Sequence, residues 1–566
     1  MRLKDQLFFG VLTLPHIMVI LVLVKLWLVL GQPLIVTFTP HDDLLFVILA
    51  QNILDGNWLG EFTDRVLIKG VFYPLFIAFS NLIQIPLLMA QHLFYALGCV
   101  VLVQAVSPIV RNKWWLLGIF LFLLFNAFTY NYSSNGRVLR LGVYSALVVF
   151  FYATMIAILI RLRDSNLKTR YRSLIIWSMG LGVSLAALWL TREEGVWLLP
   201  VLLLYAGVTI FIVVLGDFPK VKTGVIICVL PLIIWGASLL TVSFVNYQYY
   251  GVFLTNEIKS SEFRHAYSGL LRVKSDDWLA HHPFRKDSRE RIYKVSPSFK
   301  KLEPYIEGDM GREWQGGHPD INGGLFMWLL RDAVVEIGHY KHSDAPSTLA
   351  FYQSMGDEIH AACDSGQLDC ETLLHPLTPP WRSEYTELLI PTFTKVLVDI
   401  VKFRHFSPHL KTFSHTAGFD FVVPTFQYVT NDTQQVDHPI HLPKLPKFYR
   451  KWNEIKRHIL ATVGESVYRK IPQLLFVVSL LALLYLLIAQ LRRRDVDPIV
   501  ISGVLLLGGL FSHVAIITVV NITSYDGAFR LGHTDYPIVL MFCICGLVAI
   551  RNELRRKRQQ RAITSS

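Results

Sequence analysis

Residues 7–30 of the chain read LFFGVLTLPHIMVILVLVKLWLVL, with Lys25 as the one charged side chain in the run. A helix that crosses about 30 Å of hydrocarbon needs about 20 mostly apolar residues, and this stretch is long enough. It follows Arg2 and Lys4 and contains no small-residue cleavage site. We therefore expect a retained first membrane helix with a cytoplasmic amino terminus, not a removed signal peptide.

Further runs of the same kind bring the prediction to about ten spans. They lie at 87–109, 114–130, 141–160, 173–190, 195–215, 223–244, 472–491, 498–520 and 536–550. The composition agrees, since 53% of the 566 residues are hydrophobic and 17% are charged, against roughly 45–50% and about 25% in soluble domains. A mean hydropathy of +0.42 excludes disorder, and six cysteines are too few for a disulfide framework. The sequence predicts an all-α polytopic membrane protein.

The net charge of +12 is explained by where the basic residues lie. Many of them fall in short loops, at 111–113, 161–172, 220–222, 492–494 and 551–561. Counting spans from a cytoplasmic amino terminus places all these loops in the cytoplasm, as the positive-inside rule requires. Residues 31–86, the short turns near 131–140, 191–194 and 521–535, and the long segment 245–471 are left outside. The charge therefore indicates membrane topology, and we expect no nucleic-acid partner.

These assignments predict four parts of the chain. They are a membrane module of about seven spans (1–244), an extracytoplasmic domain (245–471), a second membrane module of about three spans (472–550) and a basic cytoplasmic tail (551–566). Helical periodicity in Gly324–Ile337 and Ser347–Cys363 predicts a mainly helical outer domain. Cys363 and Cys370 are its only cysteines, and an oxidising compartment would permit a disulfide between them. Two free thiols are the alternative.

The first outer loop carries the most chemical information. It reads TPHDD at 39–43, then LLFVILAQNILDGNW at 44–58, and VLIKGVFYP at 66–74. The spacing predicts an interfacial helix from Asp42 to Asp55, ended by Gly56. A carboxylate at a helix amino terminus is stabilised as the anion by the helix dipole and by unpaired N–H groups. Asp42 would then be ready to accept a proton, although Asp42 and Asp43 would also serve as simple helix caps.

This order of features resembles the first outer loop of type C glycosyltransferases. The bacterial transferases that modify lipid A with aminoarabinose, and the protein O-mannosyltransferases, are the most similar groups. Their loops also have an acidic pair, an interfacial helix and a Lys-Pro-x-x-Tyr motif, where this chain has Asp-Asp and Lys-Gly-x-x-Tyr. The resemblance continues more loosely through LTREEGVW at 190–197 and FRLGHTDYP at 529–537, whereas the segment 245–471 matches neither group.

The resemblance implies a function and a set of residues for it. A sugar would move from a polyprenyl-phosphate donor to a glycan, lipid or protein acceptor outside the plasma (inner) membrane. Asp42 would be the catalytic carboxylate that accepts the proton of the acceptor hydroxyl, with Asp43 and His41 sharing the proton. Cations at the leaving phosphate would stabilise the transition state. The substrate- and phosphate-binding residues would be His41, Lys69, Tyr73, Arg192, Glu194 and Arg530.

Several of these residues have an alternative, purely structural role. Lys69 would also anchor an interfacial helix, Arg192 would pair with Glu193 or Glu194, and Arg530 would snorkel at the head of the last span. A divalent metal, with Glu194 as a second carboxylate, stays open, because the oligosaccharyltransferase branch of the class requires one. The sequence contains no HExxH motif and no paired CxxC motif. We therefore interpret the histidines as surface residues and not as metal ligands.

Two other functions compete with the transferase. A transporter or flippase of lipid-linked sugars would show internal repeats and ionisable groups near the midplane, and we find no repeat. A non-catalytic assembly factor of the cell envelope would keep the fold and lose the chemistry; the presence of Asp42, Lys69 and Tyr73 together argues against it. An ATP-driven pump has no support, because no Walker A pattern is present.

Overall fold

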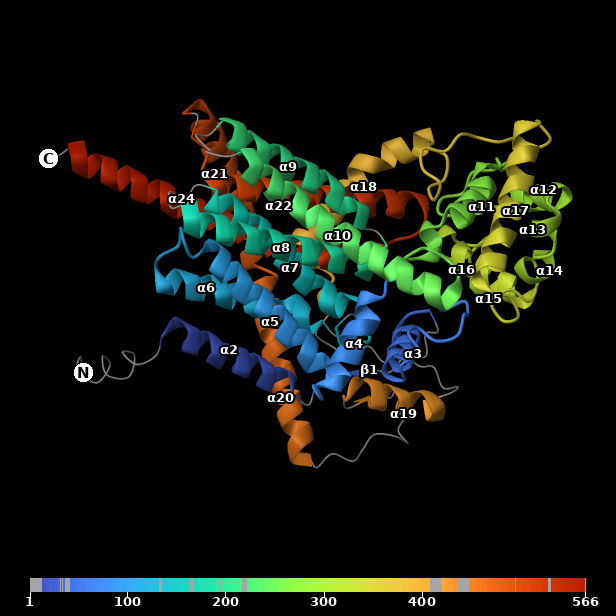
Figure 1. Cartoon of the computed structure of the whole chain (residues 1–566), viewed down its shortest axis with the longest axis horizontal. Helices are drawn as coiled ribbons and strands as arrows, with labels where there is room; N and C mark the ends of the chain where they lie inside the picture. The colour runs from blue at the N-terminus through green and yellow to red at the C-terminus, as the bar shows by residue number, and fades with distance from the viewer. Residues whose placement is uncertain are drawn as a thin grey trace.

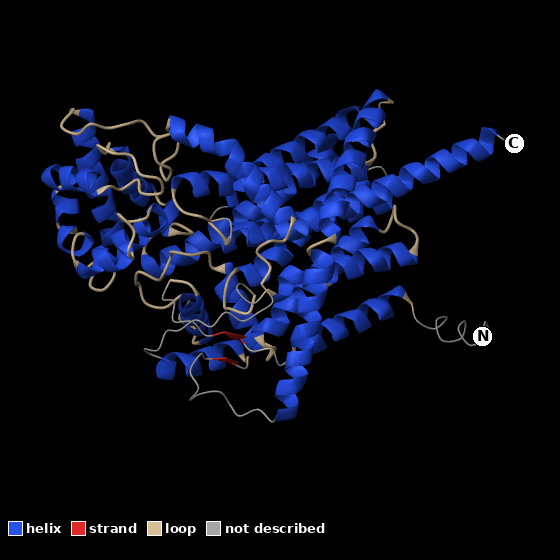
Figure 2. Ribbon diagram, turned by 180° about the vertical axis from the view of Figure 1, so that it is seen from behind, coloured by secondary structure: helices blue, strands red, loops and turns tan. Residues whose placement is uncertain are grey.

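The computed structural model describes residues 13–30, 32, 34–35, 41–131, 135–162, 167–193, 195–215, 221–407, 419–432, 434–435, 447–493, 495–527 and 531–564. Within these ranges the chain is mainly helical, and its one sheet pairs two short parallel strands, β1 (Leu34–Ile35) and β2 (Gln434–Gln435). Figure 2 shows helices throughout the molecule. The predicted all-α polytopic fold is confirmed.

Nine helical segments of the described chain are long and apolar enough to cross a membrane. They correspond to nine of the predicted spans and run over Leu87–Val106, Lys113–Tyr130, Leu141–Arg161, Tyr171–Thr191, Gly195–Val213, Gly224–Tyr250, Lys451–Arg492, Pro498–Thr523 and Gly532–Ala562. The predicted first span is the shorter helix α2 (Leu14–Val29), since residues 7–12 lie outside the described ranges.

Lys25 lies inside α2 and is bonded within the protein. Its Nζ donates to the carbonyl oxygen of Leu124 at 2.6 Å and to the hydroxyl of Thr129 at 3.0 Å. The ammonium also lies 4.8 Å from the centroid of the Tyr95 ring. A buried charge needs such partners, so Lys25 ties α2 to the neighbouring helices.

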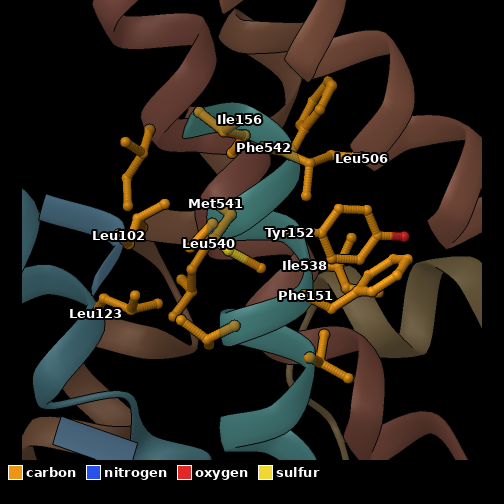
Figure 3. Close-up of a cluster of buried hydrophobic side chains, with 14 of the residues drawn as sticks. Leu102, Leu123, Phe151, Tyr152, Ile156, Leu506, Ile538, Leu540, Met541 and Phe542 are labelled. Carbon is orange, nitrogen blue, oxygen red and sulfur yellow. The ribbon is translucent and has the colours of Figure 1, made fainter. Parts of the chain in front are cut away.

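The membrane bundle is built around α7 (Leu141–Arg161), with 94% of its most apolar window buried. Helices α5 (Leu87–Val106), α8 (Leu167–Thr191), α22 (Pro498–Thr523) and α24 (Asp535–Thr564) pack against it. A helix that is apolar on every side belongs in such a central position. Figure 3 shows Phe151 and Tyr152 of α7 in one cluster with Leu506 of α22 and Ile538 of α24.

The remaining membrane helices complete the bundle. They are α6 (Lys113–Leu124), α9 (Leu198–Leu215), α10 (Val221–Tyr250) and α21 (Ile471–Arg492). Two short helices of the first outer loop, α3 (Asp43–Leu54) and α4 (Phe72–Leu82), pack against each other beside it. A helix is therefore present at nearly the predicted bounds, and Gly56 follows its end with a φ of +80°, a conformation that glycine adopts without strain. Its position at the membrane interface stays a prediction.

The segment 245–471, which we call the outer domain, has a compact helical part. Its helices are α11 (Ser261–Arg272), α12 (Lys286–Val295), α13 (Pro297–Lys300), α14 (Glu303–Ile306), α15 (Asp309–Gln315), α16 (Gly323–Glu336) and α17 (Ala345–Asp364). They share one apolar core that includes Phe263, Phe326 and Tyr352. The helices predicted from periodicity are α16 and α17. A disulfide joins Cys363 to Cys370, with the Cα atoms 5.6 Å apart.

The last third of the outer domain packs against the membrane bundle and the first outer loop, and Tyr385 of α18 also accepts a hydrogen bond from Trp278, between α11 and α12. Helix α18 (Ser383–Val401) contacts α22, α19 (Phe419–Thr430) contacts α3 and α4, and α20 (Lys447–Val463) contacts α2. Five residues of π-helix, Gly464–Tyr468, then follow α20 just before α21 begins. In Figure 1 α11–α17 lie at one end of the molecule, and α24 extends beyond the bundle at the opposite end.

Candidate functional site

Asp42 and Lys69 form an ion pair in the first outer loop. Lys69 Nζ donates to Asp42 Oδ1 at 3.0 Å, and the two side chains are 8% and 25% exposed. Asp42 is the residue before α3, but its side chain makes no hydrogen bond to the amide groups of that helix. The expected capping contact of Asp42 is therefore wrong, because the carboxylate binds a cation instead.

Asp43, the first residue of α3, is completely buried. It accepts a hydrogen bond from Arg137 Nε at 3.1 Å, and Arg137 Nη2 contacts its second oxygen. Burial acts to lower the pKa of Arg137, but the charge and hydrogen bonds of Asp43 outweigh it and raise that pKa. A carboxylate held in this way is oriented away from solvent. In this structure Asp43 anchors Arg137, and Asp42 is the more exposed carboxylate of the pair.

A second ion pair joins the 137–140 turn to the end of α8. Arg140 Nη1 donates to both oxygens of Glu193, at 2.7 and 2.6 Å, and to the carbonyl of Thr191 at 3.0 Å. The backbone amide of Gly70 donates to Glu193 Oε1 at 3.2 Å. Glu193 thus binds Arg140, and Glu194, the other partner expected for Arg192, lies outside the described residues.

Gly70 lies where the loop passes very close to α8. A Cβ atom at this position would stand 2.0 Å from the carbonyl oxygen of Leu190, closer than any van der Waals contact allows. Proline would add the same crowding and would also lack the N–H that Glu193 accepts. This explains why the chain has Lys-Gly where the groups that it resembles have Lys-Pro.

The outer domain holds the backbone just before Lys69. Asn256 Nδ2 donates to the carbonyl of Ile68 at 2.7 Å, and the amide of Glu257 donates to the carbonyl of Leu67, also at 2.7 Å. Leu67 has a φ of +62°, a left-handed conformation that is uncommon for a leucine and persists only when its surroundings impose it. The two bonds supply that constraint, so the outer domain sets the position of Lys69.

Three side chains of α15 and α16, namely Trp314, Trp328 and Asp332, lie around Lys69 and His41. The Trp328 ring lies 5.1 Å from Lys69 Nζ and 4.8 Å from the His41 ring, measured to the ring centroid. Asp332 Oδ1 is 3.6 Å from His41 Nε2, and Trp314 Nε1 donates to Asp332 Oδ2 at 3.1 Å. The site is therefore built from the first outer loop, the 137–140 turn, the end of α8 and the outer domain.

Burial and the neighbouring charges both affect the pKa of Lys69. Burial lowers the pKa of Lys69 below its ordinary value of 10.5, the charge of Asp42 opposes that shift, and Arg140 and Glu193 act with opposite signs. Two cations and two carboxylates thus influence one another at this point. Such a cluster can exchange partners when an anion enters, because each cation can leave its carboxylate for a phosphate oxygen.

The structure brings four of the eight predicted site residues together: His41, Asp42, Asp43 and Lys69. Tyr73 is fully buried on α4, where its hydroxyl accepts a hydrogen bond from Gln91 Nε2 at 3.0 Å. It therefore packs α4 against α5. Arg192 is buried, with its guanidinium 5.4 Å from the Tyr144 ring centroid. Glu194 and Arg530 lie outside the described residues.

Sequence reasoning missed Arg137, Arg140, Trp328 and Asp332. A signal for the two arginines was present, because they lie in a short turn predicted to be outside, where the positive-inside rule disfavours basic residues. The residues of α15 and α16 had no such signal. Among the described residues, no group of three or more His, Cys, Asp or Glu side chains is arranged to hold a metal ion.

An apolar cavity of about 180 Å³ lies between α8, α9 and α10. Trp189 and Trp235 line it and pack edge to face, with ring centroids 5.1 Å apart. Trp189 precedes Leu190, the residue whose carbonyl faces Gly70. The cavity therefore adjoins the part of α8 that meets the first outer loop.

No protein-family model and no curated protein matches this chain. Among solved structures the chain is similar to ArnT. The crystal structure of ArnT from Cupriavidus metallidurans bound to undecaprenyl phosphate matches with 14% identity over 93% of this chain and 77% of that chain, with a TM-score of 0.30. The apo structure of the same protein matches with 13% identity over 93% and 76%, also with a TM-score of 0.30.

At this TM-score the match places no residue of this chain, so the role of each side chain rests on the contacts described above.

Proposed function

We propose that this protein is a type C membrane glycosyltransferase. It would transfer a sugar from a polyprenyl-phosphate donor to an acceptor hydroxyl at the extracytoplasmic surface, with Asp42 as the general base. The single observation that supports this most is the pair of Lys69 and Asp42, 3.0 Å apart, beside the Arg140–Glu193 pair. A proton acceptor and phosphate-binding cations lie together at the ends of the membrane helices.

The pair suggests how donor binding would activate the base. A carboxylate bound to an ammonium group is a weak proton acceptor. When the donor phosphate enters, Lys69 turns to it, and the Asp42 carboxylate is freed. The acceptor oxygen then bonds to the anomeric carbon, the bond from that carbon to the phosphate oxygen breaks, and Asp42 takes the hydroxyl proton. Lys69 and Arg140 stabilise the charge on the leaving phosphate.

The lipid part of the donor fits the membrane side of the site. Outside the cytoplasm a sugar donor carried on a lipid is held at the bilayer surface, with its phosphate at the interface. The cavity between α8, α9 and α10 has an almost entirely apolar lining, as a prenyl chain requires. We assign this cavity to the part of the tail nearest the phosphate, because it adjoins the α8 residues that contact the first outer loop.

The proposal is tested in proteoliposomes supplied with a panel of undecaprenyl-phosphate sugars and a membrane extract as acceptor. Asp42→Asn should fold normally and lose transfer by a factor of about 10² to 10⁴, the usual contribution of a general base. Asp55→Asn, at the exposed opposite end of α3, is the matched control and should keep full activity. Retained transfer by Asp42→Asn would remove Asp42 as the base.

A further inference from the structure

His41 has an unusual environment for a loop histidine. Its ring packs between two indoles, 4.8 Å from the Trp328 centroid and 6.0 Å from that of Trp314. Nε2 faces Asp332 Oδ1 at 3.6 Å, while Nδ1 is buried and has no hydrogen-bond partner among the residues that the structure describes. This nitrogen can accept a proton during the reaction, and it belongs to the residue that directly precedes the candidate catalytic carboxylate Asp42.

Asp332 decides which nitrogen of His41 is the acceptor. Its second oxygen accepts from Trp314 Nε1 at 3.1 Å, which holds the carboxylate against the ring. In neutral histidine one nitrogen carries the proton and the other accepts, and a carboxylate beside one nitrogen favours the proton there. The Nε2 proton therefore faces Asp332, and Nδ1 is left as the acceptor. The distance of 3.6 Å is one that can shorten once substrate is bound.

We propose that His41 and Asp332 form a dyad that takes the proton from Asp42 after sugar transfer. This inference rests on the proposed function. The acceptor hydroxyl proton first moves to Asp42, then to His41 Nδ1, and the imidazolium is stabilised by Asp332 until the proton leaves to water. Asp42 is thereby returned as a carboxylate for Lys69, and no other reactant is needed. His41 is the proton acceptor, and Asp332 is a positioning residue supplied by the outer domain.

The arrangement suits such a relay. His41 directly precedes Asp42 in the chain, and Lys69, which binds Asp42, lies over the same Trp328 ring that contacts His41. The charged groups around His41 are Asp332 on α16, and Asp42 and Lys69 on the first outer loop. Helix α15 contributes the uncharged Trp314. The dyad thus gives α16 a direct part in the chemistry of the site.

The first experiment follows the protonation of His41 without any substrate. Diethyl pyrocarbonate modifies only unprotonated imidazole, and mass spectrometry reports each histidine separately. Asp332→Asn should raise the rate of His41 labelling, because Nε2 loses the carboxylate that it faces at 3.6 Å. Glu336→Gln removes a more exposed carboxylate one turn along α16, paired with Lys341 at 3.3 Å, and should leave the rate unchanged.

Two results of this experiment would overturn the dyad. One is a labelling rate for Asp332→Asn that equals that of the unmodified protein. The other is a His41 that is not labelled at any pH, since a ring closed to a small reagent at every pH has no route by which to release its proton to water.

The second experiment separates the dyad from the proposed function. In the proteoliposome assay His41→Gln should lower kcat at least tenfold with little change in KM, and Asp332→Asn should shift the acidic limb of the kcat–pH profile while Glu336→Gln does not. Unchanged kcat in His41→Gln would refute the dyad and leave Asp42 as the base. Full activity of Asp42→Asn would instead refute the proposed function, whatever the His41 labelling shows.

Discussion

Gly70 is a residue of the first outer loop at which any side chain would collide with the backbone of α8. A Cβ there would stand 2.0 Å from the Leu190 carbonyl oxygen, so Gly70→Ala must push the loop away from α8. Forced overpacking of this kind costs about 1–3 kcal/mol. We expect a lower thermal midpoint for Gly70→Ala in lipid nanodiscs, and a lower one still for Gly70→Pro, which also loses the N–H bonded to Glu193.

Gly118 provides the matched control for this substitution. It lies in α6, and a Cβ at that position would meet nothing within 4 Å. Alanine is the better helix former, so Gly118→Ala should keep or raise the thermal midpoint. A Gly70→Ala variant as stable as Gly118→Ala would show that the loop does not need its close approach to α8.

Lys69 leads to a prediction about pH. Burial lowers its pKa below 10.5, so the ammonium loses its charge at a lower pH than an exposed lysine does. The affinity for undecaprenyl phosphate should therefore fall as the pH is raised through that lowered pKa, by up to about tenfold per pH unit. Lys69→Arg should flatten the decline, because arginine stays charged at any of these pH values.

Binding of undecaprenyl phosphate to the protein in nanodiscs, measured from neutral to alkaline pH, checks this. Lys294→Arg, an exposed lysine on α12, should reproduce the curve of the unmodified protein. An equal alkaline decline in Lys69→Arg would mean that another group controls phosphate binding.

At the residue scale, the sequence predicts those parts of the site that follow a membrane span directly. Asp42 and Lys69 could be found because polar residues stand out between apolar runs. The pairing of Arg137 with Asp43 could not be predicted, because packing of the first loop against the 137–140 turn brings the two residues together. Trp328 and Asp332 belong to a helix with an ordinary amphipathic pattern. Nothing local in that pattern distinguishes a residue facing the site from one facing the core.

At the scale of a single element, helix α16 depends on a buried ion pair. Arg331 and Glu257 are 0% and 3% exposed, with Arg331 Nε donating to Glu257 Oε1 at 3.2 Å. Tyr340 contacts the same carboxylate. Burial opposes the charge of Arg331, but the charge of Glu257 outweighs it and raises the pKa of Arg331. Because Glu257 also bonds to Leu67, this pair connects α16 to the loop that carries Lys69.

Arg331→Met should therefore destabilise the outer domain by about 3–5 kcal/mol, because it leaves Glu257 as an uncompensated buried charge. Hydrogen–deuterium exchange should rise in α16 and also in residues 66–70. Lys341→Met, which removes an exposed pair with Glu336, should change exchange little. Protection of 66–70 that is unaffected by Arg331→Met would show that the loop is held independently of this pair.

Helices that cross a membrane are the elements that the sequence predicts best, since length and hydropathy suffice to mark them. The boundary of the outer domain is harder. Helices α18 and α19 have an apolar face like those of a soluble domain, yet they bury it against α22, α3 and α4. Amphipathicity predicts that a face is covered but not by what. The limits of the outer domain at residues 245 and 471 therefore stay a prediction.

The arrangement of the whole molecule places the outer domain directly over the candidate site. Figure 1 shows α11–α17 beyond one end of the membrane bundle, next to α3, while α24 leaves the bundle at the other end. The outer domain contributes Asn256, Glu257, Trp328 and Asp332 to the surroundings of Lys69 and His41. Catalysis as proposed requires this end of the bundle to face outward and the basic end of α24 to face the cytoplasm.

This orientation makes a prediction for single-cysteine labelling in intact cells. Asp309→Cys, at a side chain 98% exposed on α15, should react with a membrane-impermeant maleimide from outside. Arg558→Cys, exposed near the end of α24, should react only after the membrane is permeabilised. Cys99, Cys543 and Cys545 are buried and Cys363 is bonded to Cys370. Cys228 is free and partly exposed, so both variants carry Cys228→Ala to keep the background low.

The opposite labelling pattern would show that the topology is inverted. Asp42 and Lys69 would then face the cytoplasm, where nucleotide sugars are available and a lipid-linked donor has no advantage. The basic loops at 161–172 and 551–561 would lie outside, against the positive-inside rule. A membrane protein is oriented by those loops and not by its active site, so the labelling experiment tests the location of the proposed chemistry independently of any assay of sugar transfer.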